Sequence, residues 1–325
     1  MDRRTFVSGL ALGVLADPFV ARAQTESKVH RIGYMNLRAG PVPQDKAFVE
    51  ALEELGYVEG RNLIIDYRWA AGKEERLPAL AAELVALNVE VIVVAGTSVA
   101  NAAKRATTTI PIVMALVADP VGSGLVVSLP RPGGNITGMT QLSSELAGKR
   151  LQLVQEILPR ARRIAVLAIG GLSSTPLLLT ALRIAAQPMG LELTAQLVTK
   201  PEDLPGAFTE FQRAGAHALF VDVSPVTVDH RKAIVELAAQ HRLPAMYGSR
   251  PFVEVGGLVA YGPDAVAMLR RVANYVDKIF KGAKPGDLPV EQPTKFELVI
   301  NVKAAKALGL TIPQSLLQRA DEVFQ

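Results

Sequence analysis

The sequence predicts an α/β protein made of two doubly wound, Rossmann-like lobes joined by hinge strands. Short β-branched runs alternate with stretches of helical periodicity, the pattern of a doubly wound layer. Runs such as residues 91–94 are apolar at every position, as in a buried parallel sheet. The strands of the first half also recur in order in the second half. With 325 residues, the chain is long enough for two domains.

The first half supplies one alternation of strands and helices. We expect strands over residues 31–35, 63–69, 89–95, 110–115 and 135–140, and helices over residues 45–55, 74–87 and 98–107. In the first helix Phe48, Ala51, Leu52 and Leu55 recur at helical spacing, and Gly56 follows as a C-terminal cap. These elements form one lobe.

The second half repeats this pattern about 130 residues later. Residues 31–34 match 163–166, residues 63–67 match 191–195, residues 89–97 match 216–224, and residues 110–114 match 243–247. Because four strands recur in order, chance alternation is a poor explanation, and two similar lobes follow.

The chain is expected to cross between these lobes several times. The N-terminal lobe takes residues 29–140 plus about 263–293, and the C-terminal lobe takes residues 141–262 plus about 294–325. Hinges are expected at residues 138–144 and 261–263, after which Asp264 can cap a helix over residues 265–280. Three prolines keep the next segment extended before a strand at residues 296–300. Hinge strands between two lobes suit closure on a ligand.

The first 23 residues are typical of a signal peptide rather than of a folded segment. Arg3 and Arg4 precede an apolar run at residues 6–16, and Ala21-Arg22-Ala23 offers a cleavage site before Gln24. The run is too short to cross a bilayer, and no later run is longer, so we expect a periplasmic protein that spans no membrane. The paired arginines also resemble the twin-arginine signature, which leaves the export route open.

Composition excludes several function classes. Lys+Arg is 35 against Asp+Glu 31, without a basic stripe, so no nucleic-acid partner is expected. There is no Cys, and the four His residues lack metal-ligand spacing, so no metal site is expected. The chain has no G-x-G-x-x-G after a strand, no G-K-[ST] and no G-x-S-x-G. We therefore expect a binding protein without cofactor rather than an enzyme.

Candidate ligand contacts of the first half stand where strands end, since ligands of such sheets bind beyond the carboxyl ends of strands. They are Asn36, Gly96, Thr97, Ser98 and Asp119. Gly96 allows close approach, while Thr97 and Ser98 open a helix whose N–H groups suit a carboxylate or phosphate. A plain N-cap is the alternative there. Asp119 could receive an ammonium group or cap a turn, and Asn36 could line the cleft or close a loop.

Candidate contacts of the second half are Ser173, Ser224, Tyr247 and Glu254. Ser173 lies in the loop after the strand that contains residues 163–166, and Ser224 ends the run at residues 216–224. Tyr247 could stack on a ligand or hydrogen-bond it, and Glu254 could neutralise an amino group. A core tyrosine and a surface glutamate are the alternatives.

Longer stretches resemble a known family. They are residues 55–62, 64–69, 95–97, 110–113, 119–125, 131–138, 243–250, 256–262 and 301–310. They resemble the periplasmic substrate-binding proteins of ABC transporters of the tryptophan/tyrosine type, whose better-known members bind aromatic amino acids. The resemblance implies a type I periplasmic-binding fold without enzymatic activity or cofactor, and ABC permease membrane subunits as partners.

The sequence thus predicts an exported solute-binding protein of an ABC-type uptake system, which we expect to act as a monomer. Its ligand is expected to be a small carboxylate-bearing solute, an amino acid or related acid ahead of sugars, because one Trp and six Tyr offer few stacking platforms. Two alternatives stay open. An exported hydrolase or glycosyl-transfer enzyme would lose turnover in Glu254→Gln or Asp119→Asn, and a ligand-sensing module would have a histidine kinase gene beside it.

Overall fold

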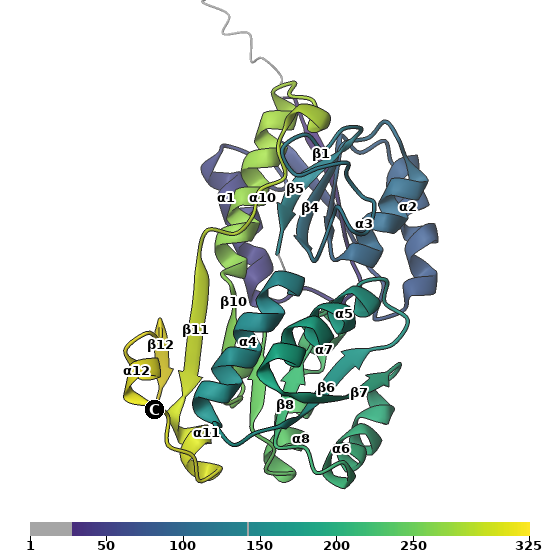
Figure 1. Ribbon diagram of the computed structural model, residues 1–325. Helices are drawn as coiled ribbons and strands as arrows, with labels where there is room; N and C mark the ends of the chain where they lie inside the picture. Colours follow the sequence, from purple (N-terminus) through teal and green to yellow (C-terminus); the bar gives the residue numbers. More distant parts are fainter. Residues whose placement is uncertain (1–27, 142) are drawn as a thin grey trace, which may run out of the picture.

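The computed structural model describes residues 28–141 and 143–325 as two α/β lobes stacked one above the other (Figure 1). The expected signal peptide at residues 1–23 lies outside the described residues. Within the described ranges, no helix is both long and apolar enough to cross a membrane. The predicted fold class, two doubly wound lobes, is confirmed by the two sheets described below.

The first lobe is built on a five-stranded parallel sheet in the order β2-β1-β3-β4-β5. Its strands are β1 (His30–Asn36), β2 (Leu63–Trp69), β3 (Val91–Ala95), β4 (Ile112–Val117) and β5 (Ile136–Thr140). Helices α1 (Lys46–Glu54) and α10 (Ala265–Phe280) pack on one face, and α2 (Leu77–Ala86) and α3 (Thr97–Ala106) on the other. Every residue of β3 is buried because helices cover both faces.

The second lobe is built on a seven-stranded sheet in the order β12-β11-β10-β9-β8-β6-β7, in which β10 and β11 are antiparallel. Its strands are β6 (Arg163–Ile169), β7 (Glu192–Val198), β8 (Ala218–Val221), β9 (Ala245–Tyr247), β10 (Val259–Pro263), β11 (Phe296–Asn301) and β12 (Glu322–Phe324). Its helices are α4 (Ser143–Ile157), α5 (Thr175–Ala186), α6 (Leu204–Arg213), α7 (Pro225–Asp229), α8 (Arg231–Gln240), α9 (Pro251–Glu254), α11 (Val302–Ala307) and α12 (Gln314–Leu317). The order β7-β6-β8-β9-β10 repeats β2-β1-β3-β4-β5, as the internal duplication predicts.

Most predicted elements are present, and the differences lie at their ends. The helix expected over residues 74–87 begins as a 3-10 turn, Glu74–Arg76, and becomes α-helical at Leu77. Leu55 was expected on the buried stripe of α1, but the helix ends at Glu54 and leaves this side chain 36% exposed. The expected cap is present, since Asp264 Oδ1 accepts a hydrogen bond from the N–H of Ala267 at 3.0 Å.

The chain passes between the lobes at three places. It leaves β5 for α4, and it leaves β10 for α10, which packs on the first sheet. It then runs beside β5, where the N–H of Glu291 donates to Gly138 O at 2.9 Å and the N–H of Thr140 donates to Glu291 O at 3.0 Å. From there it returns to the second sheet as β11. Three connecting segments therefore hold the two lobes together.

Candidate functional site

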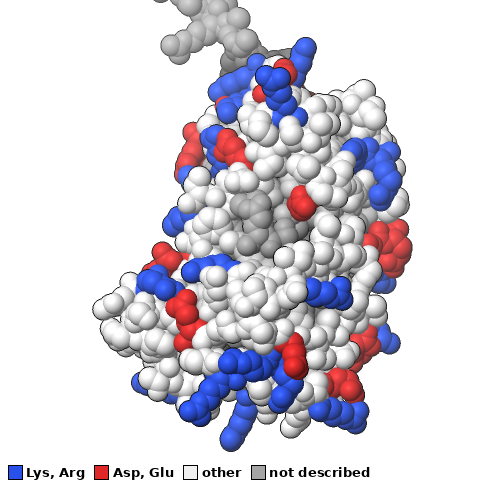
Figure 2. Space-filling model, viewed as in Figure 1, with Lys and Arg blue, Asp and Glu red and all other residues white. Residues whose placement is uncertain are grey.

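The cleft lies between the lobes, beyond the carboxyl ends of strands from both sheets, and consists of two adjoining cavities. Both cavities are lined by residues of β4, of the hinge and of the loops after β3 and β8: Gly96, Leu116, Gln141, Val223, Ser224 and Pro225. Such an edge is where open α/β sheets bind ligands. On the face shown in Figure 2, acidic and basic side chains are interspersed around the middle of the molecule.

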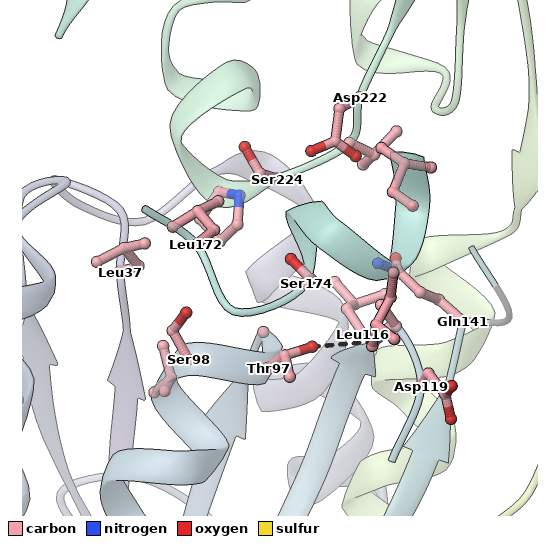
Figure 3. A pocket seen from close by; sticks show the side chains of 17 residues that line it. Leu37, Thr97, Ser98, Leu116, Asp119, Gln141, Leu172, Ser174, Asp222 and Ser224 are labelled. Atoms are coloured by element: carbon pink, nitrogen blue, oxygen red, sulfur yellow. Dashed lines mark hydrogen bonds between the residues drawn. The ribbon is translucent and has the colours of Figure 1, made fainter. Parts of the chain in front are cut away.

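The first cavity, here called the polar cavity, is lined by hydroxyl and carboxyl groups from both lobes. Thr97, Ser98 and Asp119 come from the first lobe, and Ser174 and Asp222 from the second. Figure 3 shows Thr97 and Ser98 at the start of α3, with Ser174 and Ser224 on the opposite side. The cavity therefore offers both donors and acceptors to a small solute.

Two helix N-termini meet at the polar cavity from opposite lobes. Ser98, in the first turn of α3, and Ser173, just before α5, approach with their Oγ atoms 3.4 Å apart. Gly96 precedes α3 with φ +101°, which allows β3 to turn directly into the helix. The first N–H groups of a helix have no intrahelical partner and lie at the positive end of its dipole. This geometry suits a carboxylate.

Asp222 brings a buried carboxyl group to the same cavity. It follows β8 and is 7% exposed, and no ion pair reaches it among the described residues. Burial raises the pKa of the Asp222 carboxyl to about 6, while the charge of Arg150 and a hydrogen bond from the N–H of Val223 oppose that shift. A buried carboxylate without a close cation is costly, so a cationic group on the solute would be stabilised there.

The second cavity, here called the apolar cavity, is lined mainly by hydrophobic side chains: Val42, Ala95, Leu116, Val223, Pro225, Val228, Pro251, Pro263, Ala265 and Leu269. One wall is polar, because Arg38 Nη2 pairs with Asp45 Oδ2 at 2.6 Å and Tyr34 donates its hydroxyl to Asp45 Oδ1 at 3.0 Å. The guanidinium also lies 5.5 Å from the ring centroid of Trp69. The cavity suits an apolar or aromatic group beside the polar cavity.

Leu116 lies in an irregular part of β4 at the junction of the two cavities. Its φ is +53°, and the pairing with β5 shifts register between Met114 and Val117. Such a bulge redirects a side chain, and a non-glycine residue at positive φ is strained. The irregularity therefore places Leu116 where both cavities meet.

The structure brings six of the nine expected residues to the cleft: Asn36, Gly96, Thr97, Ser98, Asp119 and Ser224. Ser173 lies at the edge of the cleft, where its Oγ atom is 3.4 Å from that of Ser98. Asp119 Oδ1 accepts a hydrogen bond from the N–H of Gly122 at 2.8 Å. Asp119 therefore caps a turn, which was the alternative interpretation of this residue. Ser224 also caps a helix, because its Oγ accepts the N–H of Thr227 at 3.2 Å.

Tyr247 and Glu254 are not brought to the cleft. Tyr247 is 1% exposed and stacks on Phe252 with ring centroids 4.8 Å apart, which fits the alternative of a core tyrosine. Both residues line a separate hollow beside α8, α11 and the C-terminal end of the chain. The short helix α9 carries Glu254 away from the cleft, so a solute there does not reach its carboxylate.

Sequence reasoning missed Arg38, Leu116, Arg150, Ser174 and Asp222. A signal for Asp222 was present, because it is the first polar residue after the apolar run at residues 218–221. The expected strand ran on to Ser224, and this hid the strand end that Asp222 follows. Nothing local marks Leu116 or Arg38 as cleft residues.

Comparisons with known proteins agree with this geometry. Residues 43–324 match the family model described as ABC transporter substrate binding protein. A tyrosine-binding protein of Clostridioides difficile is 28% identical over 265 residues, or 82% of this chain and 76% of that one. The structure of an ABC domain in complex with L-Trp from Streptococcus pneumoniae is 25% identical, covers 91% of this chain and all of that one, and has a TM-score of 0.84.

A third relative has a lower overall structural similarity to this chain. The ligand-free, open structure of a substrate binding protein with adhesive properties from Clostridium difficile is also 25% identical and also covers 91% of this chain and 100% of its own. Its TM-score is only 0.65, against 0.84 for the complex with L-Trp. At equal identity and coverage, the overall structure of this chain is therefore more similar to the complex with L-Trp than to the ligand-free, open structure.

Contacts across the cleft agree with a closed arrangement. The N–H of Ala39, in the first lobe, donates to Asp229 Oδ2 at the end of α7 in the second lobe, at 2.8 Å. Ser98 and Ser173 approach from opposite lobes, and Gly96 faces Pro225. The described lobes therefore meet over the cleft.

Proposed function

Because the chain belongs to the family of ABC transporter substrate binding proteins, we propose that it captures an amino acid or a related carboxylate-bearing solute in its cleft and delivers it to an ABC permease. Proteins of this family bind substrates rather than convert them, so the hydrolase alternative is set aside. The observation that carries the proposal is the convergence of two helix N-termini and a buried carboxylate on one cavity between the lobes.

The carboxylate of the solute is assigned to the start of α3. Thr97 Oγ1 accepts the N–H of Ala118 at 3.3 Å, which leaves its hydroxyl hydrogen free to be donated, and Ser98 offers a second hydroxyl. The positive end of the helix dipole adds to both. Both hydroxyl groups that support this assignment line the polar cavity.

The ammonium group is assigned to Asp222 and the side chain to the apolar cavity. Asp222 is favoured over Asp119, which is only half-buried, and over Glu254, which lies in a separate hollow. The hydrophobic lining of the apolar cavity and the tyrosine- and tryptophan-binding relatives support an aromatic side chain. Export to the periplasm is proposed from the signal-like residues 1–23.

Aromatic L-amino acids are expected to raise the melting temperature of the purified protein by several degrees. A ligand at about 100 times its Kd stabilises the state that binds it by about 2.7 kcal/mol. Tyramine, which lacks the carboxylate, and glucose are expected to give no shift. The measurement is thermal denaturation with L-tyrosine, L-tryptophan, tyramine and glucose. Stabilisation by glucose alone would contradict the proposal.

Thr97→Val and Ser98→Ala test the assigned carboxylate contact by titration calorimetry with the stabilising amino acid. Each loss of a hydrogen bond to a charged group should cost about 1–3 kcal/mol, or about 5–150-fold in affinity. Thr209→Val, on the exposed surface of α6, is the matched control and should leave affinity unchanged. Full affinity in both cleft variants would refute the assignment of the carboxylate to α3.

A further inference from the structure

Arg150 is a buried cation that the proposed solute does not touch. It comes from α4, is 2% exposed and is not among the residues that line the cleft. Its Nε–H donates to Tyr261 O, on hinge strand β10, at 2.7 Å, and Nη2 donates to Gly248 O at 3.3 Å. Burial lowers the pKa of Arg150 to about 10, which leaves it charged at neutral pH.

Glycines allow the guanidinium to lie this close to the backbone. A Cβ atom on Gly248 would lie 2.8 Å from Arg150 Nη2 and 2.2 Å from Val223 Cγ2, so the guanidinium lies beside the residue that follows Asp222. A Cβ atom on Gly262 would overlap the carbonyl oxygen of Gly248. The guanidinium is therefore held in one place by the hinge strand and by the loop after β9.

The charged groups around Asp222 are few. From α4, Arg150 acts on it through its charge without a direct ion pair. From β10, the carbonyl oxygen of Tyr261 accepts a hydrogen bond from Arg150. Across the cavity, Asp119 belongs to the loop after β4, while Arg38 and Asp45 neutralise one another in the apolar cavity. Among the described residues Arg150 is thus the cation that favours the ionised form of Asp222.

We infer that Arg150 is a positioning residue that keeps the cleft carboxylate of Asp222 ionised before a solute arrives, and thereby sets the pH range over which an ammonium-bearing solute binds. This inference rests on the proposed function. The physical reason is that an ammonium group binds the carboxylate and not the carboxylic acid. A cation fixed beside Val223, the residue that follows Asp222, lowers the cost of holding that charge in a buried cavity. Affinity for an amino acid therefore falls as pH drops through about 6.

The test is the affinity of L-tyrosine and of 3-(4-hydroxyphenyl)propionate, measured by titration calorimetry between about pH 5 and about pH 8. The second probe lacks only the ammonium group. For the wild-type protein, affinity for L-tyrosine should rise with pH to a plateau, while the deaminated acid shows no such rise. In Arg150→Met the midpoint should move up by about one pH unit, which lowers L-tyrosine affinity about tenfold below the midpoint.

Three further variants separate charge from packing. Arg150→Lys keeps the charge and should keep the midpoint, even where it weakens both probes. Asp222→Asn should abolish the pH dependence and weaken L-tyrosine by about 10–150-fold while sparing the deaminated acid. Arg183→Met, an exposed arginine of α5, is the matched control.

Equal weakening of both probes at every pH in Arg150→Met, with an unmoved midpoint, would mean a purely structural role and overturn the inference. Should that variant fail to fold, pH-independent binding of L-tyrosine to the wild-type protein, or a pH rise that persists in Asp222→Asn, would overturn it as well. Failure of both probes to bind the wild-type protein at any pH would instead refute the proposed function on which the inference rests.

Discussion

Gly96→Val is expected to weaken the binding of an aromatic amino acid by about 100-fold or more while both lobes stay folded. Gly96 has φ +101° and ψ 151°, a combination that is essentially restricted to glycine and costs other residues about 1–3 kcal/mol. A Cβ atom there would already lie 3.5 Å from Pro225 Cγ in the opposite lobe. The valine methyl groups would extend further and hold the lobes apart.

Two further variants separate the effect of backbone strain at Gly96 from the effect of the contact with Pro225. Gly96→Ala carries the backbone strain with a side chain that Pro225 still accommodates, so it should lose less affinity than Gly96→Val. Gly190→Val places the same side chain at positive φ with no neighbour within 4 Å and away from the cleft, so affinity should be kept. Calorimetric titration decides this, and a Gly96→Val variant with wild-type affinity would contradict closure over Gly96.

Gly262→Ala is expected to lower the free energy of unfolding by about 3 kcal/mol. The added Cβ atom would overlap the carbonyl oxygen of Gly248, and this obstacle is backbone that cannot rotate away. The hinge strand would have to shift, and the hydrogen bonds from Arg150 to Tyr261 and Gly248 would shift with it. Urea unfolding followed by circular dichroism measures the loss.

Gly206→Ala is the control for the same substitution. Gly206 lies inside α6 with no atom within 4 Å of an added Cβ, so alanine there should stabilise the protein by about 0.5–1 kcal/mol. A Gly262→Ala variant as stable as the wild-type protein would show that β10 and the loop after β9 are not held as tightly as described.

The fold could be predicted from the sequence because its signals are local. The strand patterns that became β2 and β3 are each visible in a few residues, and their recurrence about 130 positions later revealed the second lobe. The glycine, threonine and serine at residues 96–98 were found for the same reason, since the rule that ligands bind beyond strand ends needs only the position of a strand end.

The residues that were missed depend on contacts between distant parts of the chain. Arg150 is 111 residues from Tyr261 and 98 from Gly248, so no window of sequence contains this cluster. Leu116 lines the cleft because of a bulge in β4, and the local sequence does not predict this bulge. Tyr247 was a candidate contact because it belongs to a polar and aromatic stretch beside the predicted sheet, yet stacking on Phe252 places it in the core.

Small-angle scattering of the purified protein with and without saturating L-tyrosine or L-tryptophan tests most directly whether the cleft closes on an amino acid. Lobes that are apart in the free protein and meet through Ser98–Ser173 and Ala39–Asp229 when the cleft is filled should give a smaller radius of gyration. A measurable decrease with either amino acid, absent in Gly96→Val, is the predicted result. A radius of gyration that stays the same while calorimetry shows binding would contradict the account.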